Sequence, residues 1–218
     1  MQISKKSCTF AAQKNVPIML EAFYKTHNYL VDHVQVPARR LLMDEINWND
    51  RLIAIKGGRG VGKTDFLLNY AKELRTTNPE LSKRTLYVNF NDFYFTEHSL
   101  VEFAGEFVAA GGHTLLIDQA FKYPNWSREL SQCYYNYKDL HIVFTASSVM
   151  RLVEDNKDLC SIVHPYNLRG FSFREYLNVT LGLKLPAYSL EEILHNHIDI
   201  AHRISQRINP LDYFNDYL

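Results

Sequence analysis

Short, continuous apolar runs alternate along the chain with segments whose apolar residues recur at helical spacing. The runs occupy residues 51–56, 85–90, 113–118 and 141–145, and a fifth, short strand is predicted near 166–168. Apolar runs of this length, bounded by turn residues, predict strands buried on both faces. Helices are predicted between and after them at 65–74, 99–110, 126–137 and 173–177. The alternation predicts an α/β fold of three layers, α/β/α, around a mainly parallel five-stranded sheet.

Additional helices are predicted before and after this alternating region. Residues 1–16 are polar and without periodicity, Pro17 opens a helix that continues through Leu30, and a second helix covers 39–46. Near the C-terminus, Ser189 is the predicted N-cap of a further helix. We therefore expect three parts: an N-terminal segment with helices at 1–46, a core at 47–180, and a C-terminal helical segment at 181–218.

Composition limits the classes of function. The 218 residues contain 24 basic and 24 acidic side chains, so overall charge does not indicate binding to nucleic acid or to an anionic membrane. Arg39 and Arg40 are expected to be solvated charges of the second helix. No secretory signal or membrane-length apolar run is present, and three scattered cysteines form no disulfide or zinc pattern. We expect a soluble cytoplasmic protein with no membrane partner.

The strongest chemical signal is the stretch from Gly57 to Thr64, which fits the pattern G-x-x-x-x-G-K-[ST] between a predicted strand and a predicted helix. Backbone N–H groups can grip a polyphosphate only where no side chain intervenes, and glycine permits the required conformations. Lys63 is expected to reach the β- and γ-phosphates, and the Thr64 hydroxyl to ligate Mg²⁺. The expected nucleotide-binding residues are Gly57, Gly58, Arg59, Gly60, Val61, Gly62, Lys63, Thr64 and Asp65.

A phosphate loop needs an acidic partner at the end of a neighbouring strand to hold Mg²⁺, and Asp118 fits this Walker B role. One predicted strand lies between the two motifs, an order that is similar to that of the AAA+ ATPases. That similarity implies a glutamate after the aspartate as the base for the attacking water, but this chain has Gln119. Loss of a positioned base typically lowers a rate by about 10²–10⁴-fold. Asp92 and Glu97 are weighed as substitute carboxylates, with ordinary loop roles favoured.

The end of the fourth strand supplies one more candidate. In AAA+-like proteins a polar residue at this position, sensor 1, contacts the γ-phosphate or the water. Ser147 or Ser148 fits that role, and either one fits equally well as the N-cap of a following helix. With Lys63 and Gln119, Ser147 completes the expected catalytic set.

Together these stretches resemble the bacterial and archaeal AAA-type ATPases of the "ATP-binding protein" group, in which a P-loop domain precedes a C-terminal domain of unknown function. The resemblance covers about residues 39–180. The stretches that carry it are 57–64, 117–118, 122–126, 145–148 and 171–177. It implies that 181–218 begins a truncated second region.

Three positions depart from the family pattern. Gln119 replaces the usual Glu, Ala146 replaces a Gly, and residues 159–162 lack an arginine pair that the family often has. Arg151 and Arg169 are the only replacement candidates for that pair.

The leading functional hypothesis is an ATP-binding AAA-type domain with Mg²⁺ and ATP as cofactors and with slow hydrolysis. The alternative is a nucleotide-gated switch or interaction module without meaningful turnover. A small-molecule kinase would need an arginine-rich lid, and none is visible. The nucleotide, ATP or ADP, is the expected ligand, and a protein partner or a homo-oligomer remains open.

Overall fold

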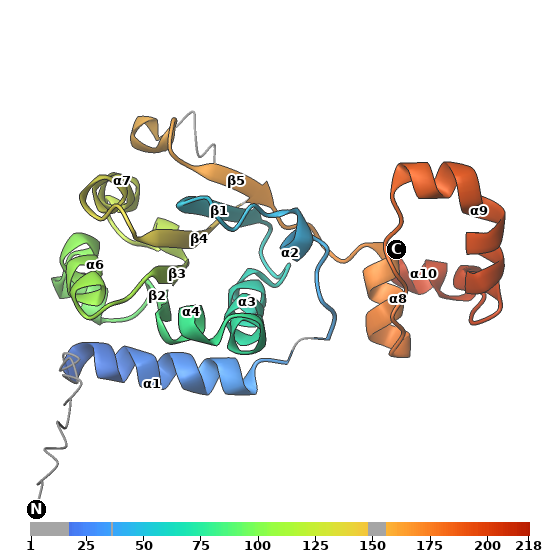
Figure 1. Ribbon diagram of the computed structural model, residues 1–218, viewed down its shortest axis with the longest axis horizontal. Helices are drawn as coiled ribbons and strands as arrows, with labels where there is room; N and C mark the ends of the chain where they lie inside the picture. Colours follow the sequence, from blue (N-terminus) through green and yellow to red (C-terminus); the bar gives the residue numbers. More distant parts are fainter. Residues whose placement is uncertain (1–17, 36, 148–155) are drawn as a thin grey trace, which may run out of the picture.

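The computed structural model describes residues 18–35, 37–147 and 156–218 (Figure 1). Within them the five predicted strands form one sheet in the order β2-β3-β4-β1-β5, and every pair of neighbours is parallel. The strands are β1 (Leu52–Gly57), β2 (Thr85–Asn89), β3 (Thr114–Asp118), β4 (His141–Ser147) and β5 (His164–Asn167). The α/β/α class predicted from the apolar runs is confirmed.

Alternate residues of each strand enter two separate cores, one on each face of the sheet. In β1, Leu52 and Ala54 face one core, whereas Ile53 and Ile55 face the other. The first core packs under α6 (Leu100–Ala109) and α7 (Trp126–Asn136), and the second under α3 (Lys63–Thr77). Because both faces are covered, β1 to β4 are mostly buried and apolar, which explains the continuous runs in the sequence, whereas the edge strand β5 is largely exposed.

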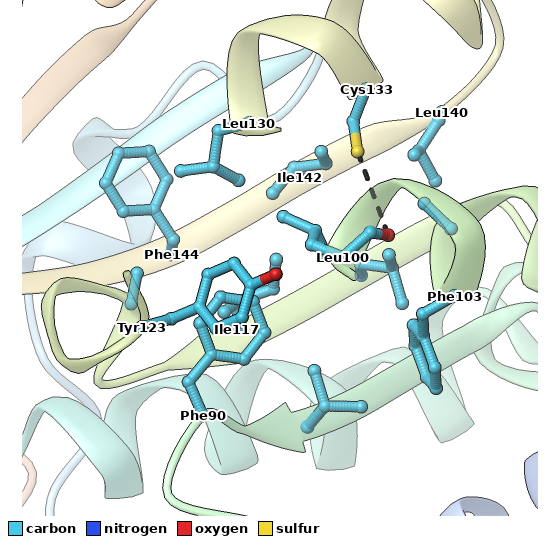
Figure 2. Close-up of a cluster of buried hydrophobic side chains, with 14 of the residues drawn as sticks. Phe90, Leu100, Phe103, Ile117, Tyr123, Leu130, Cys133, Leu140, Ile142 and Phe144 are labelled. Carbon is cyan, nitrogen blue, oxygen red and sulfur yellow. Dashed lines mark hydrogen bonds between the residues drawn. The ribbon is translucent and has the colours of Figure 1, made fainter. Parts of the chain in front are cut away.

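Figure 2 shows the core under α6 and α7. Side chains of β3 and β4 meet those of the two helices, and the Cys133 thiol on α7 lies 4.0 Å from the Leu100 carbonyl oxygen on α6. Burial raises the pKa of this thiol to about 12, so Cys133 is a packing residue.

The first helix, α1 (Ile18–His33), runs along the free edge of the sheet at β2. Leu20 and Val31 are fully buried, and the buried His27 accepts a hydrogen bond at Nδ1 from the Tyr87 backbone N–H of β2 at 3.0 Å. An open strand edge carries unpaired backbone groups, and α1 covers this one. The sequence contains no local signal for this role of His27.

Several connecting elements are short. They are α2 (Leu42–Glu45), α4 (Pro79–Lys83), α5 (Tyr94–Glu97), η1 (Ala120–Lys122) and η2 (Lys157–Leu159). The helix predicted at 39–46 is therefore reduced to four residues, and Arg39 and Arg40 precede it.

The C-terminal helices are α8 (Phe173–Leu181), α9 (Leu190–Ser205) and α10 (Phe214–Tyr217), with the 3₁₀ helix η3 (Pro210–Tyr213) before the last. They lie beyond the arrowhead of β5, to the right of the sheet in Figure 1. Ser189 and Glu192 form a capping box at the start of α9, which confirms the predicted N-cap. No helix within the described ranges is long and apolar enough to span a membrane.

Candidate functional site

The glycine-rich loop connects the end of β1 at Gly57 to the start of α3 at Lys63. Gly60 and Gly62 have φ values of 84° and 87°, which side chains rarely tolerate. At Gly57 the limit is space, because a Cβ atom would lie 2.5 Å from the Leu168 carbonyl oxygen. Gly57, Gly60 and Gly62 are thus required by this backbone, whereas Gly58 has room for a side chain.

Lys63 lies over the loop that precedes it. Its ammonium donates to the carbonyl oxygens of Gly57 at 2.9 Å and Gly58 at 2.7 Å. Burial lowers the pKa of Lys63, and the nearby charge of Asp118 partly offsets that effect. A cation is therefore held at the centre of the loop by backbone contacts alone.

Asp118, at the end of β3, is 1% exposed and accepts four hydrogen bonds. Thr64 Oγ1 donates to Oδ2 at 2.7 Å, and this bond joins the start of α3 to the end of β3. Thr145 Oγ1 donates to Oδ1 at 2.6 Å, the Gln119 N–H to Oδ1 at 3.0 Å, and the Tyr87 hydroxyl to Oδ2 at 3.1 Å. Four donors satisfy a carboxylate that burial alone would make costly.

Two of these donors, Tyr87 and Thr145, are functional positions that the sequence analysis missed. Both lie in strands that read as apolar, and each places one hydroxyl against the carboxylate. Burial first, and then the charge of Asp118, raises the pKa of Tyr87, so its hydroxyl keeps its proton and donates. The available signal in the sequence was a hydroxyl-bearing residue within each of these otherwise apolar strands.

The donor set suits Mg²⁺. The Thr64 hydroxyl and the Asp118 carboxylate provide hard oxygen atoms that already lie 2.7 Å apart at the helix start. The residues predicted as metal ligands are thus brought together.

A cavity of about 730 Å³ extends from this pair across the carboxyl end of the sheet. It is lined by Gly57, Arg59, Gly60, Gly62, Lys63, Thr64, Asp65, Asp118, Gln119, Phe121, Lys122 and Ser147. Gln119 adopts a left-handed conformation with φ 56° and ψ 39°, and its N–H bonds with Asp118 and Thr145 hold it there. Ser147 is placed in the cavity, whereas Ser148 lies outside the described residues.

The proposed substitute carboxylates are not among the residues that line this cavity. Asp92 accepts the Tyr94 N–H at 3.0 Å within its own turn, and Glu97 lines a separate groove. The ordinary loop roles favoured for both residues agree with these positions.

A second, smaller cavity of about 180 Å³ lies on the other side of the loop, next to the first. The two share Gly60, Gly62 and Asp65. The walls of the small cavity are largely apolar and come from Pro37, Ala38, Arg40, Val61, Phe66, Asn69 and Phe171. The residues from 37–40 and Phe171 are far apart in the sequence, and no motif indicated them.

Arg40 corrects one expectation. It was predicted to be a solvated helix charge, yet its side chain is only 11% exposed and pairs with Glu175 on α8 at 3.2 Å. The same guanidinium donates to the carbonyl oxygens of Val61 at 3.1 Å and Arg169 at 2.6 Å. It also lies 4.7 Å from the centre of the Phe171 ring. Arg40 therefore joins the phosphate loop to the segment before α8. Arg39, in contrast, is half exposed, as expected.

Of the two arginines considered as replacements for the missing pair, Arg169 is not among the residues that line the large cavity. Arg169 is exposed and lines a different groove, next to Leu41 and Tyr217. Arg151 lies outside the described residues.

A family model described as an AAA domain matches residues 49–177, more than half of the 218 residues. The chain therefore belongs to the AAA domain family, and the matched region is a P-loop ATPase domain of the AAA type. The family indicates nucleotide binding.

One curated relative is the uncharacterized protein MJ1637 of Methanocaldococcus jannaschii. It is 26% identical over 178 residues, which make up 76% of this chain and 36% of that protein. The chain thus spans about a third of the length of this relative.

Among solved structures, domain III of the replication initiation protein DnaA from Thermotoga maritima superposes with a TM-score of 0.43 and 18% identity, over 78% of this chain and 72% of that one. AMPPCP-bound DnaA from Aquifex aeolicus gives 0.41 and 15%, over 85% and 60%. PCH-2 from C. elegans gives 0.41 and 18%, over 73% and 43%. Likenesses at these scores say nothing about function.

Proposed function

We propose that this domain binds ATP with Mg²⁺ and hydrolyses it slowly. The observation that carries the proposal is the 2.7 Å hydrogen bond between Thr64 and Asp118, because it joins the two halves of a nucleotide site across 54 residues of sequence. Lys63 and the N–H groups at the start of α3 supply positive charge to the phosphates. When bound, Mg²⁺ supplies further charge neutralisation, and Thr64 and Asp118 would hold it.

The two adjoining cavities support one orientation of the nucleotide. The larger cavity contains the side-chain cations Arg59, Lys63 and Lys122 and suits the phosphates. The smaller one is mostly apolar, lies across the shared residue Asp65, and suits a nucleobase. Asn69 provides amide donor and acceptor groups there, which would select among base edges.

Slow hydrolysis follows from Gln119. Its amide can orient a water molecule by hydrogen bonding but cannot accept a proton. Asp118, the nearest carboxylate, already accepts four hydrogen bonds and is therefore a poor substitute base. Ser147, in the same cavity, would contact the terminal phosphate or the water. The same observation favours the alternative, a switch that holds ATP without meaningful turnover.

The test compares three forms of the domain for ATP affinity and for phosphate release. The unchanged domain should bind ATP more tightly with Mg²⁺ than with EDTA, and Lys63→Ala should lose most of that affinity while keeping its thermal stability. Gln119→Glu should release phosphate faster by about 10²–10⁴-fold.

The outcomes separate the hypotheses. Measurable but slow release by the unchanged domain supports the ATPase, and release only by Gln119→Glu supports the switch. Fast release by the unchanged domain refutes the argument from Gln119. Absence of ATP binding refutes the ATPase and the switch together.

A further inference from the structure

Lys122 lines the phosphate cavity and also the neighbouring groove that contains Glu97, and neither the P-loop nor the metal site uses it. It is the last residue of η1, which directly follows β3 and Gln119. In the described part of the chain no carboxylate lies within ion-pair distance of Lys122. Its ammonium is therefore available to an anion that enters the cavity.

The backbone under Lys122 is held from both sides. The Gln119 N–H is bonded to two buried side chains, and the Lys122 N–H donates to the Gln119 carbonyl at 3.0 Å. On the other side, Tyr123 is 8% exposed and its hydroxyl donates to Glu129 at 2.9 Å. Gln119 precedes η1 and Lys122 ends it, and both residues line the cavity.

The order of the two cavities and the P-loop places Lys122 near the terminal-phosphate end of a bound nucleotide. The apolar cavity meets the phosphate cavity at Gly60, Gly62 and Asp65, on the P-loop side. A phosphate chain that starts there and passes Lys63 and Thr64 ends nearest the wall formed by Gln119 and Lys122. Strand β4 separates β1 from β3 in the sheet, so this wall is two strands away from the loop.

We propose that Lys122 contacts the terminal phosphate of a nucleoside triphosphate and so makes the domain discriminate triphosphate from diphosphate. This inference rests on the proposed nucleotide binding and names what the site distinguishes. Lys122 also supplies positive charge to a cavity that Arg169 does not line. A lysine provides a mobile point charge with three donors, which suits a phosphate oxygen.

The experiment measures dissociation constants for ATP, for a non-hydrolysable β,γ-methylene analogue and for ADP, all with Mg²⁺. The variants are Lys122→Met and Lys122→Arg, and the control is Lys138→Met. Lys138 is an exposed lysine in the turn just before β4, at the opposite end of the sheet. The control removes the same charge away from the cavity and so measures long-range electrostatics.

Lys122→Met should weaken ATP and the analogue about tenfold, the low end for a hydrogen bond to a charged group, and leave ADP unchanged. Lys122→Arg should recover most of the loss, and Lys138→Met should change nothing. Equal losses for ATP and ADP, or no loss at all, would overturn the inference while leaving nucleotide binding intact. No binding of either nucleotide by the unchanged domain would refute the proposed function and this inference with it.

Discussion

Replacing Arg40 by methionine is the most informative perturbation of the fold around the site. Arg40 and Glu175 form an ion pair whose side chains are 11% and 6% exposed, so neither charge has water to replace its partner. Glu175 also accepts the N–H groups of Leu41 at 3.0 Å and Ser172 at 2.8 Å. Despite its burial, these bonds and the charge of Arg40 lower the pKa of Glu175.

The magnitude follows from the geometry. At 3.2 Å the Coulomb attraction is about 5 kcal/mol at an effective dielectric constant of about 20, and desolvation cancels part of it. Arg40→Met also leaves the carbonyl oxygens of Val61, Arg169 and Gly170 without this donor. We therefore expect a loss of about 3–5 kcal/mol in the free energy of unfolding, typical of a broken buried pair.

The assay is urea denaturation of Arg40→Met, Glu175→Gln and the double variant. The double-mutant cycle should give a coupling energy of about 2 kcal/mol. Arg39→Met is the control, since Arg39 pairs with Asp44 at 2.6 Å and with Glu73 at 2.9 Å but is itself about half exposed. We expect it to lose less than about 1 kcal/mol. The reasoning is refuted if Arg40→Met costs no more than Arg39→Met, or if the coupling is zero.

Three further outcomes are expected. Burial lowers the pKa of His27 to about 4, below its unfolded value of about 6.5, so the stability that the neutral ring contributes is complete above pH 6.5 and is lost as the pH falls toward 4. The free energy of unfolding measured at pH 7.5 should therefore exceed that at pH 4.5 by up to about 3 kcal/mol. His27→Asn keeps a hydrogen-bond acceptor without titrating and should reduce that difference. Thr145→Val removes a donor to Asp118 and should lower thermal stability by about 1–3 kcal/mol, whereas an unchanged melting temperature would mean that this bond contributes nothing net. Gly57→Ala places a Cβ atom 2.5 Å from the backbone of Leu168 and should reduce the yield of folded protein, measured by circular dichroism, far more than an alanine at the roomier Gly58.

Much of the fold was predictable because the spacing of apolar residues in strands and helices, and the turn residues between them, are local features of the sequence. Strands buried on two faces are largely apolar, and β1 to β4 were identified from that pattern, whereas the edge strand β5 is mostly exposed and does not show it. The P-loop was equally clear, since its glycines and Lys63 are required within eight consecutive residues. The role of Asp118 as its partner followed from its place at the end of a buried strand.

The rest was not predictable because it depends on which segments the sheet order brings together. In the sequence Arg40 looks like a surface charge, and only packing against Glu175, 135 positions away, makes it a buried connector. Likewise Tyr87 and Thr145 read as strand residues until β2, β3 and β4 lie side by side.

The sequence by itself determined the α/β alternation, the phosphate loop and the absence of a glutamate after Asp118, because each is written in neighbouring residues. Only the tertiary structure decided which side chains satisfy that carboxylate, where an apolar cavity adjoins the loop, and that Lys122 lines the same cavity as the P-loop. These features depend on strand order and on contacts between residues far apart in the chain. Such contacts leave no local pattern in the sequence.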